Sequence, residues 1–251
     1  MIFRRSIFFL LLMGALIGKA QYIESDTTSQ WIRVDCHDNA LLLPLAGATM
    51  IAGSLTHILE EGETLNHYVR NTVQQWKSEH GPMEGSHLHF DNYIQFLPAA
   101  TPWILKKAGV STRSSYRDLL WIEIESFAIF NVVVQTVKYT TRVPRPSGWV
   151  RNSFPSGHTA TAFWGAEIAR SEFRESAPWV GYSAYALAAL TGLMRIYNDR
   201  HWLGDVLAGA GVGIASARLA YWAHPHIHRW LNPQPQPSTS FSYTPVLTSF
   251  N

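Results

Sequence analysis

The chain has almost no cysteine and little charge. Cys36 is the only cysteine among 251 residues, so neither an internal disulfide nor a CxxC pair for zinc is available. Charged residues make up 15% of the chain, against about a quarter in an ordinary soluble domain, whereas 47% are hydrophobic. This composition excludes a disordered or fibrous protein and one that works through cysteine chemistry. The length fits one domain of moderate size.

The first 20 residues have the pattern of a cleaved export signal. Arg4 and Arg5 precede an uncharged run that extends to Gly18, and small residues surround the predicted cleavage point after Ala20. Cleavage removes three basic residues and no acidic one, so the 20 Lys and Arg fall to 17 against 18 Asp and Glu. We therefore expect an exported, periplasmic protein without a polybasic surface for nucleic acid. An uncleaved membrane anchor is the alternative interpretation.

The remainder predicts an all-α fold, a compact helical bundle of about six core helices that fills residues 21–231. We expect helices over residues 40–59, 62–79, 93–107, 115–138, 158–171, 178–196 and 202–223. The spacing of Ser115 and Asp118 resembles a capping box and predicts a helix start. Pro225 is expected to break helical register. Residues 232–251 are rich in Pro and Ser and predict an extended tail, with a weak strand pattern over 241–250.

One long, nearly uncharged run lies beyond the signal, from Ala40 to Leu59. It is long enough to span a bilayer, and it equally fits a buried helix packed through its glycines. The run 119–137 contains Glu123 and Glu125, which are costly against lipid. Near-zero mean hydropathy argues against six clean membrane spans. We expect a helical domain seated on or partly in a membrane, and the ten Trp residues are compatible with that location.

Two permanent cations are predicted at the end of the helix over 115–138. Lys138 is followed, after six residues, by Arg145 and Pro146 in a proline-stiffened loop. The lysine ammonium supplies a point charge and the guanidinium a planar fork of donors, so the pair can hold a tetrahedral oxyanion. A solvated basic helix end is the alternative.

The segment 153–160, S-F-P-S-G-H-T-A, predicts an anion site at the start of a helix. Free N–H groups at a helix N-terminus attract anions, and Gly157 allows the backbone to approach an oxyanion closely. Ser156 can add a hydroxyl donor, and His158 is a candidate proton donor. A capped helix with an incidental histidine is the alternative.

Arg195, His201 and Asp205 make a third constellation. If His201 begins a helix, His201 and Asp205 lie four residues apart on one face and can meet. A carboxylate that accepts the Nδ1 hydrogen leaves Nε2 with its lone pair, as a nucleophilic imidazole requires. Arg195 then supplies a third phosphate clamp. A surface His–Asp pair is the alternative.

In this order, K-x6-RP, PSGH and R-x5-H-x3-D resemble the type 2 phosphatidic acid phosphatase superfamily. That superfamily also includes bacterial class A acid phosphatases and vanadium-dependent haloperoxidases. The motifs cover residues 138–205. One departure is Met194, which stands where the family usually has a serine, so one phosphate contact is absent.

The resemblance implies roles for the motif residues. It implies that His201 takes the phosphoryl group as a phosphohistidine, that Asp205 orients it, and that His158 protonates the departing alkoxide. It also implies a phosphate site without a metal or cofactor, formed by Lys138, Arg145, Ser156, Gly157 and Arg195.

The function expected is an exported, membrane-associated phosphatase that hydrolyses a phosphate monoester. The preferred substrate is a membrane lipid, such as phosphatidate, a polyprenyl phosphate or pyrophosphate, or a phosphorylated lipid A. The alternatives are a soluble periplasmic acid phosphatase of broad specificity, a vanadium haloperoxidase and a membrane module without activity. The haloperoxidase is disfavoured because those chains are generally much longer.

Other polar groups have plainer interpretations. The tracts His87–His89 and His224–His228 resemble metal-binding runs, but we interpret them as surface histidines without acidic partners. Asp199 and Arg200 are expected to shape the pocket or to pair with each other. Asn198 and Trp202 fit either site shape or packing.

Overall fold

The computed structural model describes residues 36–57, 60–81, 90–148 and 150–231, and these residues form helices and loops without a strand. The prediction of an all-α fold is therefore confirmed. The helices are α2 (Cys36–Leu55), α3 (Glu60–His80), α4 (Asp91–Ile94), α5 (Leu97–Lys107), α6 (Tyr116–Thr141), α7 (Gly157–Phe173), α8 (Pro178–Tyr197) and α9 (Leu203–Leu231).

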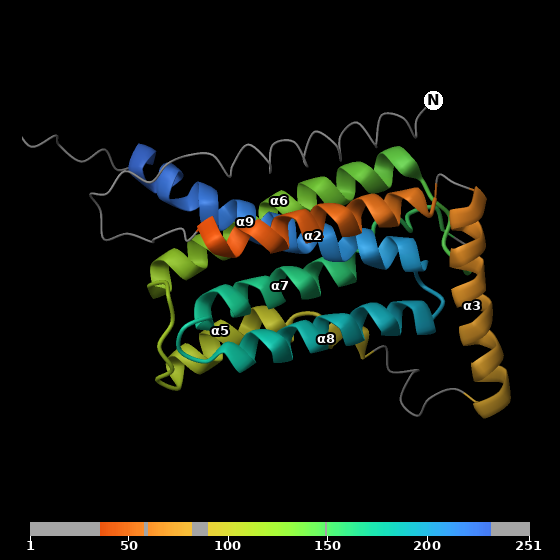
Figure 1. The fold of residues 1–251 in the computed structure, drawn as a ribbon, viewed down its shortest axis with the longest axis horizontal. Coiled ribbons are helices and arrows are strands. Elements are labelled where there is room, and N and C mark those ends of the chain that lie inside the picture. The colour runs from red at the N-terminus through yellow and green to blue at the C-terminus, as the bar shows by residue number, and fades with distance from the viewer. Residues whose placement is uncertain (1–35, 58–59, 82–89, 149, 232–251) are drawn as a thin grey trace, which may run out of the picture.

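The long helices lie along one direction, and α3 crosses one end of them (Figure 1). Helix α9 is central, since it packs against α2, α6 and α7, and α7 packs in turn against α5 and α8. These six helices form the core bundle that the sequence predicts. Within the described residues, helix α3 packs mainly against α8 and α9, and both contacts are small.

Glycines on α9 allow it to touch α7. A Cβ atom at Gly209 would lie 2.5 Å from the carbonyl oxygen of Ser156, and one at Gly213 would lie 2.8 Å from the backbone nitrogen of Trp164. Both distances are too short for a real Cβ contact, so only glycine fits at these positions. The close crossing brings the first turn of α7 against the first turns of α9.

The helix boundaries agree with the prediction to within about four residues, except that the predicted helix over 93–107 divides into α4 and α5 and that α9 runs farther than residue 223. The oxygen of Ser115 accepts the backbone N–H of Asp118 at 3.1 Å, so the predicted cap at the start of α6 is present. The sequence predicts that this helix ends before Pro225. Helix α9 instead continues through Pro225 to Leu231. A proline inside a helix removes one N–H from the hydrogen-bond ladder and crowds the carbonyl oxygen four residues earlier, and α9 continues despite both effects.

Glu123 and Glu125 of α6 are turned toward protein rather than outward. Glu123 accepts the indole N–H of Trp103 at 2.9 Å, and Glu125 lies 3.1 Å from Nδ1 of His224. The outward face of the helix is apolar, with Leu120, Trp121, Ile124, Phe127 and Val132 exposed. The acids therefore do not prevent this helix from facing an apolar medium.

Two described helices are long and apolar enough to cross a membrane, Tyr116–Thr141 and Leu203–Trp230. The sequence singles out 40–59 as the one long apolar run beyond the signal, and this prediction is wrong, because both candidate spans lie elsewhere and the described part of that region contributes only the shorter apolar run Pro44–Leu55. The second candidate is mostly buried inside the bundle, whereas the first is mostly at its surface. The predicted signal (1–20), the tail (232–251) with its possible strand, and His87 and His89 lie outside the described residues.

Candidate active site

The predicted site residues meet at one end of the bundle, beside α3 (Figure 1). Helices α2, α6 and α8 end there, and α7 and α9 begin there. Lys138 lies in the last turn of α6, Arg195 in the last turn of α8, and Asp205 in the first turn of α9. Three segments distant in sequence thus contribute charged groups to one place.

His201 and Asp205 are in contact and are both buried. Nδ1 of His201 lies 3.3 Å from Oδ2 of Asp205, and the two residues are 3% and 0% exposed. The predicted reason for this contact was wrong, because His201 precedes α9 instead of beginning it. Asp205 reaches back over the helix start, where it also accepts the backbone N–H of Trp202 at 2.8 Å, as in a capping box.

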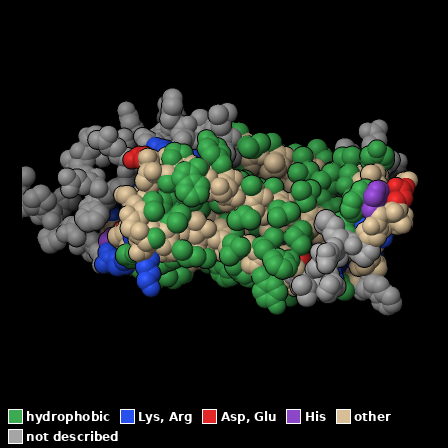
Figure 2. Space-filling view, turned by 90° about the horizontal axis from the view of Figure 1, so that it is seen from below, with side chains coloured by type: hydrophobic (Ala, Val, Ile, Leu, Met, Phe, Trp, Pro, Cys, Tyr) green, Lys and Arg blue, Asp and Glu red, His purple; other side chains and the backbone are tan. Residues whose placement is uncertain are grey.

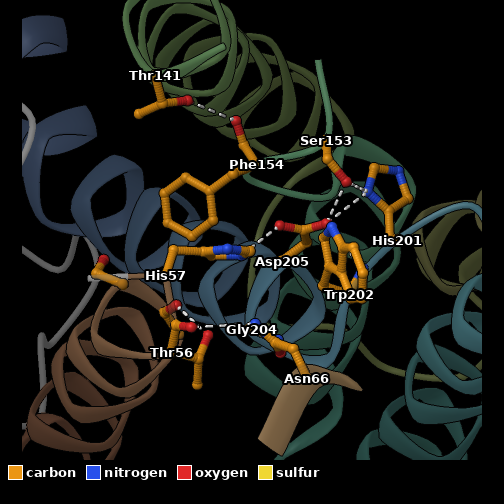
Figure 3. Close-up of polar contacts among 12 residues, drawn as sticks. Thr56, His57, Asn66, Thr141, Ser153, Phe154, His201, Trp202, Gly204 and Asp205 are labelled. Atoms are coloured by element: carbon orange, nitrogen blue, oxygen red, sulfur yellow. Dashed lines mark hydrogen bonds and ion pairs between the residues drawn. The ribbon is translucent and has the colours of Figure 1, made fainter. Parts of the chain in front are cut away.

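Both oxygens of the Asp205 carboxylate have protein partners (Figure 3). The Ser153 hydroxyl donates to Oδ2, the oxygen that also faces His201. Nε2 of His57 lies 2.8 Å from Oδ1. The carboxylate is therefore held from opposite sides, by the loop before α7 and by the residues that follow α2.

His201 is held neutral at ordinary pH. Burial lowers the pKa of the imidazole, the nearby charges of Lys138 and Arg195 act in the same direction and Asp205 opposes them, and the net effect is a pKa lowered to about 4. In a neutral ring one nitrogen carries hydrogen and the other a lone pair. Since Nδ1 faces a carboxylate, Nδ1 is the donor and Nε2 keeps its lone pair.

The start of α7 is a capped helix N-terminus with Gly157 as its first residue. The Ser156 oxygen accepts the backbone N–H of Thr159 at 3.4 Å and the Thr159 hydroxyl at 2.9 Å. The backbone N–H of Ser156 donates to the carbonyl oxygen of Asp205 at 2.9 Å. Ser156 is fully buried, so its hydroxyl serves the helix cap in this arrangement.

His158 lies on the first turn of α7 and is partly exposed. Its Nε2 lies 2.8 Å from Oδ1 of Asn92, on the short helix α4. Burial lowers the pKa of His158 to about 4, and the fields of Arg195, His201 and Arg145 act in the same direction. The structure therefore brings the two predicted histidines and two of the predicted cations within electrostatic reach of one another.

Arg195 is buried and paired. Its Nη1 donates to Oδ2 of Asp91, and Nδ2 of Asn198 donates to Oδ1 of the same carboxylate at 3.2 Å. Arg195 is 5% exposed and Asp91 fully buried. The adjacent residues Asp91 and Asn92 thus hold Arg195 and His158 respectively.

Lys138 and Arg145 are anchored to the same segment before α7. Nζ of Lys138 donates to the carbonyl oxygen of Asn152 at 2.6 Å, and Nε of Arg145 donates to the Asn152 side chain at 2.9 Å. Burial lowers the pKa of Arg145, and the positive charges of Arg195 and Arg200 add to that effect. The mutual influence of these cations marks a concentration of positive charge, which is what a phosphate dianion needs.

Sequence reasoning missed the partners that the structure adds from outside the motifs: His57, Asn66, Arg70, Asp91 and Asn92. Asp199 does not pair with Arg200 as one expectation had it. Its carboxylate instead receives Nε and Nη2 of Arg70, from α3, at 2.7 and 2.9 Å. None of these residues has a motif-like spacing to the core of the site, so no pattern in the sequence identifies them.

The histidine tract near the end of α9 is not wholly exposed. His224 is 4% exposed, and its ring contacts Glu125 at 3.1 Å and Asp118 at 3.7 Å, so the expectation of no acidic partner is wrong for this residue. His226 is exposed, as expected. Among the described residues, no group of three or more His, Cys, Asp or Glu side chains is arranged to hold a metal ion.

The helical fold is similar to that of a solved phosphatase of the PAP2 type. A solved structure, the transmembrane PAP2 type phosphatidylglycerolphosphate phosphatase from Bacillus subtilis, superposes with a TM-score of 0.51 over 77% of this chain and 98% of its own, at 18% identity. At that identity the likeness concerns the fold. The family model of the PAP2 superfamily matches residues 119–229 of this chain.

Two curated relatives are similar over part of the chain. A lipid A 1-phosphatase from Porphyromonas gingivalis is 38% identical over 144 residues, which are 57% of this chain and 32% of the relative. The bacitracin transport permease protein BcrC from Bacillus licheniformis is 34% identical over 86 residues, which are 33% of this chain and 40% of the relative. The matched segments therefore cover less than half the length of either relative.

Proposed function

We propose that this protein is a phosphatase that removes the phosphate from a lipid phosphate monoester through a phosphohistidine on His201. The observation that carries the proposal is the buried contact between His201 and Asp205, within reach of three cations. A neutral imidazole with Nδ1 bound to a carboxylate presents the lone pair of Nε2. The concentrated positive charge supports binding of the substrate's phosphoryl oxygens.

The reaction is proposed to proceed in two displacements. Nε2 of His201 attacks phosphorus, the N–P bond forms, and the bond from phosphorus to the lipid oxygen breaks. His158 gives its proton to that oxygen. A water then attacks the phosphohistidine, His158 takes a proton from the water, and inorganic phosphate leaves. Lys138, Arg145 and Arg195 neutralise the phosphoryl oxygens throughout, with the backbone at Gly157 adding N–H donors at the helix start.

His158 must gain a proton to act as the acid, although its pKa lies near 4 without substrate. After burial, the positive charges of Arg195 and Arg145 are among the groups that lower it. A bound phosphate dianion offsets those charges, so binding raises the pKa of His158 toward its ordinary value. The substrate is thus proposed to help protonate its own acid.

The outer surface supports a lipid substrate and a membrane location. Figure 2 shows apolar side chains across the middle of one face of the bundle, with charged side chains toward the ends. Exposed large apolar residues on α5, α6 and α8 include Leu97, Ile104, Trp121, Phe127, Trp179, Tyr182 and Leu193. Such a band fits the hydrocarbon layer, with the polar active-site end outside it. The export signal predicted over 1–20 supports a periplasmic orientation.

Among lipid phosphates, the 1-phosphate of lipid A is the first substrate to test, because a lipid A 1-phosphatase is 38% identical over 144 residues. The full chain in detergent is assayed for phosphate release from lipid A 1-phosphate, phosphatidate, a polyprenyl diphosphate and a small soluble ester. Lipids are expected to react faster than the soluble ester. The opposite ranking would favour a soluble phosphatase of broad specificity.

The intermediate has its own test. Rapid quenching with radiolabelled substrate should trap protein-bound phosphate that is labile to acid and stable to base, as a phosphohistidine is. His201→Ala should lose the label and the activity, whereas His226→Ala, which changes an exposed histidine on α9, should keep both. Unchanged phosphate release by His201→Ala contradicts the proposed mechanism.

A further inference from the structure

The carboxylate of Asp205 has a partner that no motif supplies. Its Oδ2 faces His201, Ser153 and the backbone N–H of Trp202. Its Oδ1 faces Nε2 of His57 at 2.8 Å, and the two side chains are 0% and 9% exposed respectively. A carboxylate only accepts hydrogen bonds, so Nε2 of His57 is the donor.

His57 is placed firmly at this position. It follows α2 in a turn, where its backbone N–H donates to the carbonyl oxygen of Ser54 at 3.2 Å. Its ring meets the ring of Phe154 edge-on, with centroids 5.2 Å apart. Phe154 is the next residue after Ser153, which holds the other oxygen of the carboxylate. Figure 3 shows His57 and Ser153 on opposite sides of Asp205.

The turn that carries His57 is also tied to the start of α9. Asn66, from α3, donates to the carbonyl oxygen of Thr56 at 3.2 Å and accepts the backbone N–H of Gly204 at 3.0 Å. Gly53 and Gly204 make this approach close, because a Cβ atom at Gly53 would lie 2.7 Å from the backbone nitrogen of Ala208. The end of α2 therefore cannot move far from the first turn of α9.

We propose that His57 is a positioning residue that fixes the carboxylate of Asp205 against His201. The proposal rests on the function proposed above. The terminal torsion of an aspartate is broad, so a carboxylate held at one oxygen can rotate. A donor at Oδ1 stops that rotation and keeps Oδ2 on Nδ1 of His201. Residue 57 lies outside the matched family region, 119–229.

The second effect of His57 concerns charge. A hydrogen bond to Oδ1 draws negative charge away from Oδ2 and so weakens the attraction of Asp205 for a proton on His201. The other groups whose fields reach His201 are Lys138, on α6, and Arg195, on α8, and they remain in place when His57 is changed. Loss of the donor should therefore raise the pKa of His201.

Two substitutions separate the donor from the ring. His57→Gln keeps an N–H donor at similar reach and loses the ring, whereas His57→Phe keeps a ring against Phe154 and loses the donor. We expect His57→Phe to reduce kcat about 10- to 100-fold, as loss of a partner that orients an acting group commonly does. KM should change less than about threefold. His57→Gln should recover most of the lost kcat, and His80→Ala, an exposed histidine on α3, should leave the kinetics unchanged.

The pH profile distinguishes positioning from general support of the fold. In His57→Phe the acid limb of kcat/KM should move to higher pH. The carboxylate of Asp205 then lacks the hydrogen bond at Oδ1, so it favours protonation of His201 more strongly. In His57→Gln the limb should stay near its wild-type position. A role limited to packing predicts the reverse order, with Phe active and Gln impaired, and that result would overturn the proposal.

A measurement without turnover keeps the proposal separate from the proposed function. In the full chain labelled with 15N-histidine, NMR in detergent gives the tautomer and pKa of His201. We expect the Nδ1–H tautomer in the wild type and in His57→Gln, and a raised pKa in His57→Phe. If the wild type hydrolyses no phosphate ester, the function fails while this measurement still stands. An identical His201 pKa in all three chains refutes the role of His57.

Discussion

The carboxylate of Asp91 lies against the guanidinium of Arg195, and the two side chains are 0% and 6% exposed. This ion pair joins the short helix α4 to the end of α8. Arg195 is one of the cations proposed to bind phosphate, so its counter-ion fixes its place before substrate arrives. Removal of one member of a buried pair leaves the other charge without compensation.

Asp91→Ala should therefore lower the free energy of unfolding by about 3–5 kcal/mol, the usual cost of breaking a buried pair. The matched control is Arg70→Ala, which breaks the partly exposed pair with Asp199 and should cost about 1 kcal/mol or less. Denaturant unfolding of both variants in detergent measures the difference. Equal losses would show that burial does not set the strength of these pairs.

The pH dependence of activity follows from the two histidines. His201 has its pKa lowered to about 4 by burial, so it becomes an unreactive imidazolium only below that pH, and the acid limb should lie near 4. His158 also has a pKa of about 4 without substrate. Because kcat/KM reports the free enzyme, it should fall as the pH rises above about 4 and His158 loses the proton that it donates.

Bound phosphate raises the pKa of His158, so the alkaline limb of kcat should lie at higher pH than that of kcat/KM. Steady-state kinetics between about pH 3 and 9 measures both limbs. The limbs belong to a coupled pair and not to single residues. A monotonic profile, or alkaline limbs that coincide, would count against His158 as the acid.

Stability should depend on pH through the same groups. Both histidines have folded-state pKa values near 4 and ordinary values of 6.5, so the unfolded chain binds more protons between these limits. The free energy of unfolding should therefore fall as the pH falls from about 6.5 to 4. His158→Gln should flatten this slope in denaturant titrations, whereas the exposed control His226→Gln should not. A slope that His158→Gln leaves intact would mean that other groups control acid stability.

Vanadate should inhibit, because a site complementary to a trigonal-bipyramidal phosphoryl group also fits a five-coordinate oxyanion. Chelators should not inhibit if Lys138, Arg145 and Arg195 supply the neutralising charge. Phosphate release measured with increasing vanadate, and separately after EDTA treatment, checks both statements. Activity lost in EDTA and restored by a divalent ion would contradict this account of the charge.

The close packing of α7 against α9 can be tested by adding one methyl group to α9, at Gly213. A Cβ atom at Gly213 would lie 2.8 Å from the backbone nitrogen of Trp164 and would also meet the carbonyl oxygen of Ala160. Gly213→Ala should destabilise the fold by about 2 kcal/mol or more, since the backbones must separate. Gly47→Ala is the control, because nothing lies within 4 Å of its added Cβ atom, and it should stabilise α2 by up to about 1 kcal/mol. Similar effects at both positions would show that the crossing is not tight.

Much of the fold could be predicted from the sequence because helix signals are local. The spacing of Ser115 and Asp118 predicts the start of α6, and apolar periodicity predicts the other long helices to within a few residues. The failures have local causes too. Pro225 lies within α9, so the rule that a proline ends a helix fails here. Helix α4 was not separated from the predicted helix over 93–107, because a four-residue turn has no period to detect.

The sequence by itself determined the motif residues, since Lys138, His158 and His201 are recognisable by type and spacing alone. Tertiary structure alone decided their partners. His57, Asn66 and Asp91 reach the site through helix crossings between segments up to 148 residues apart, and contacts of that separation leave no periodic trace in a single chain. Burial at those crossings also sets the protonation of both histidines, because the cost of charging an imidazole depends on the solvent that packing removes.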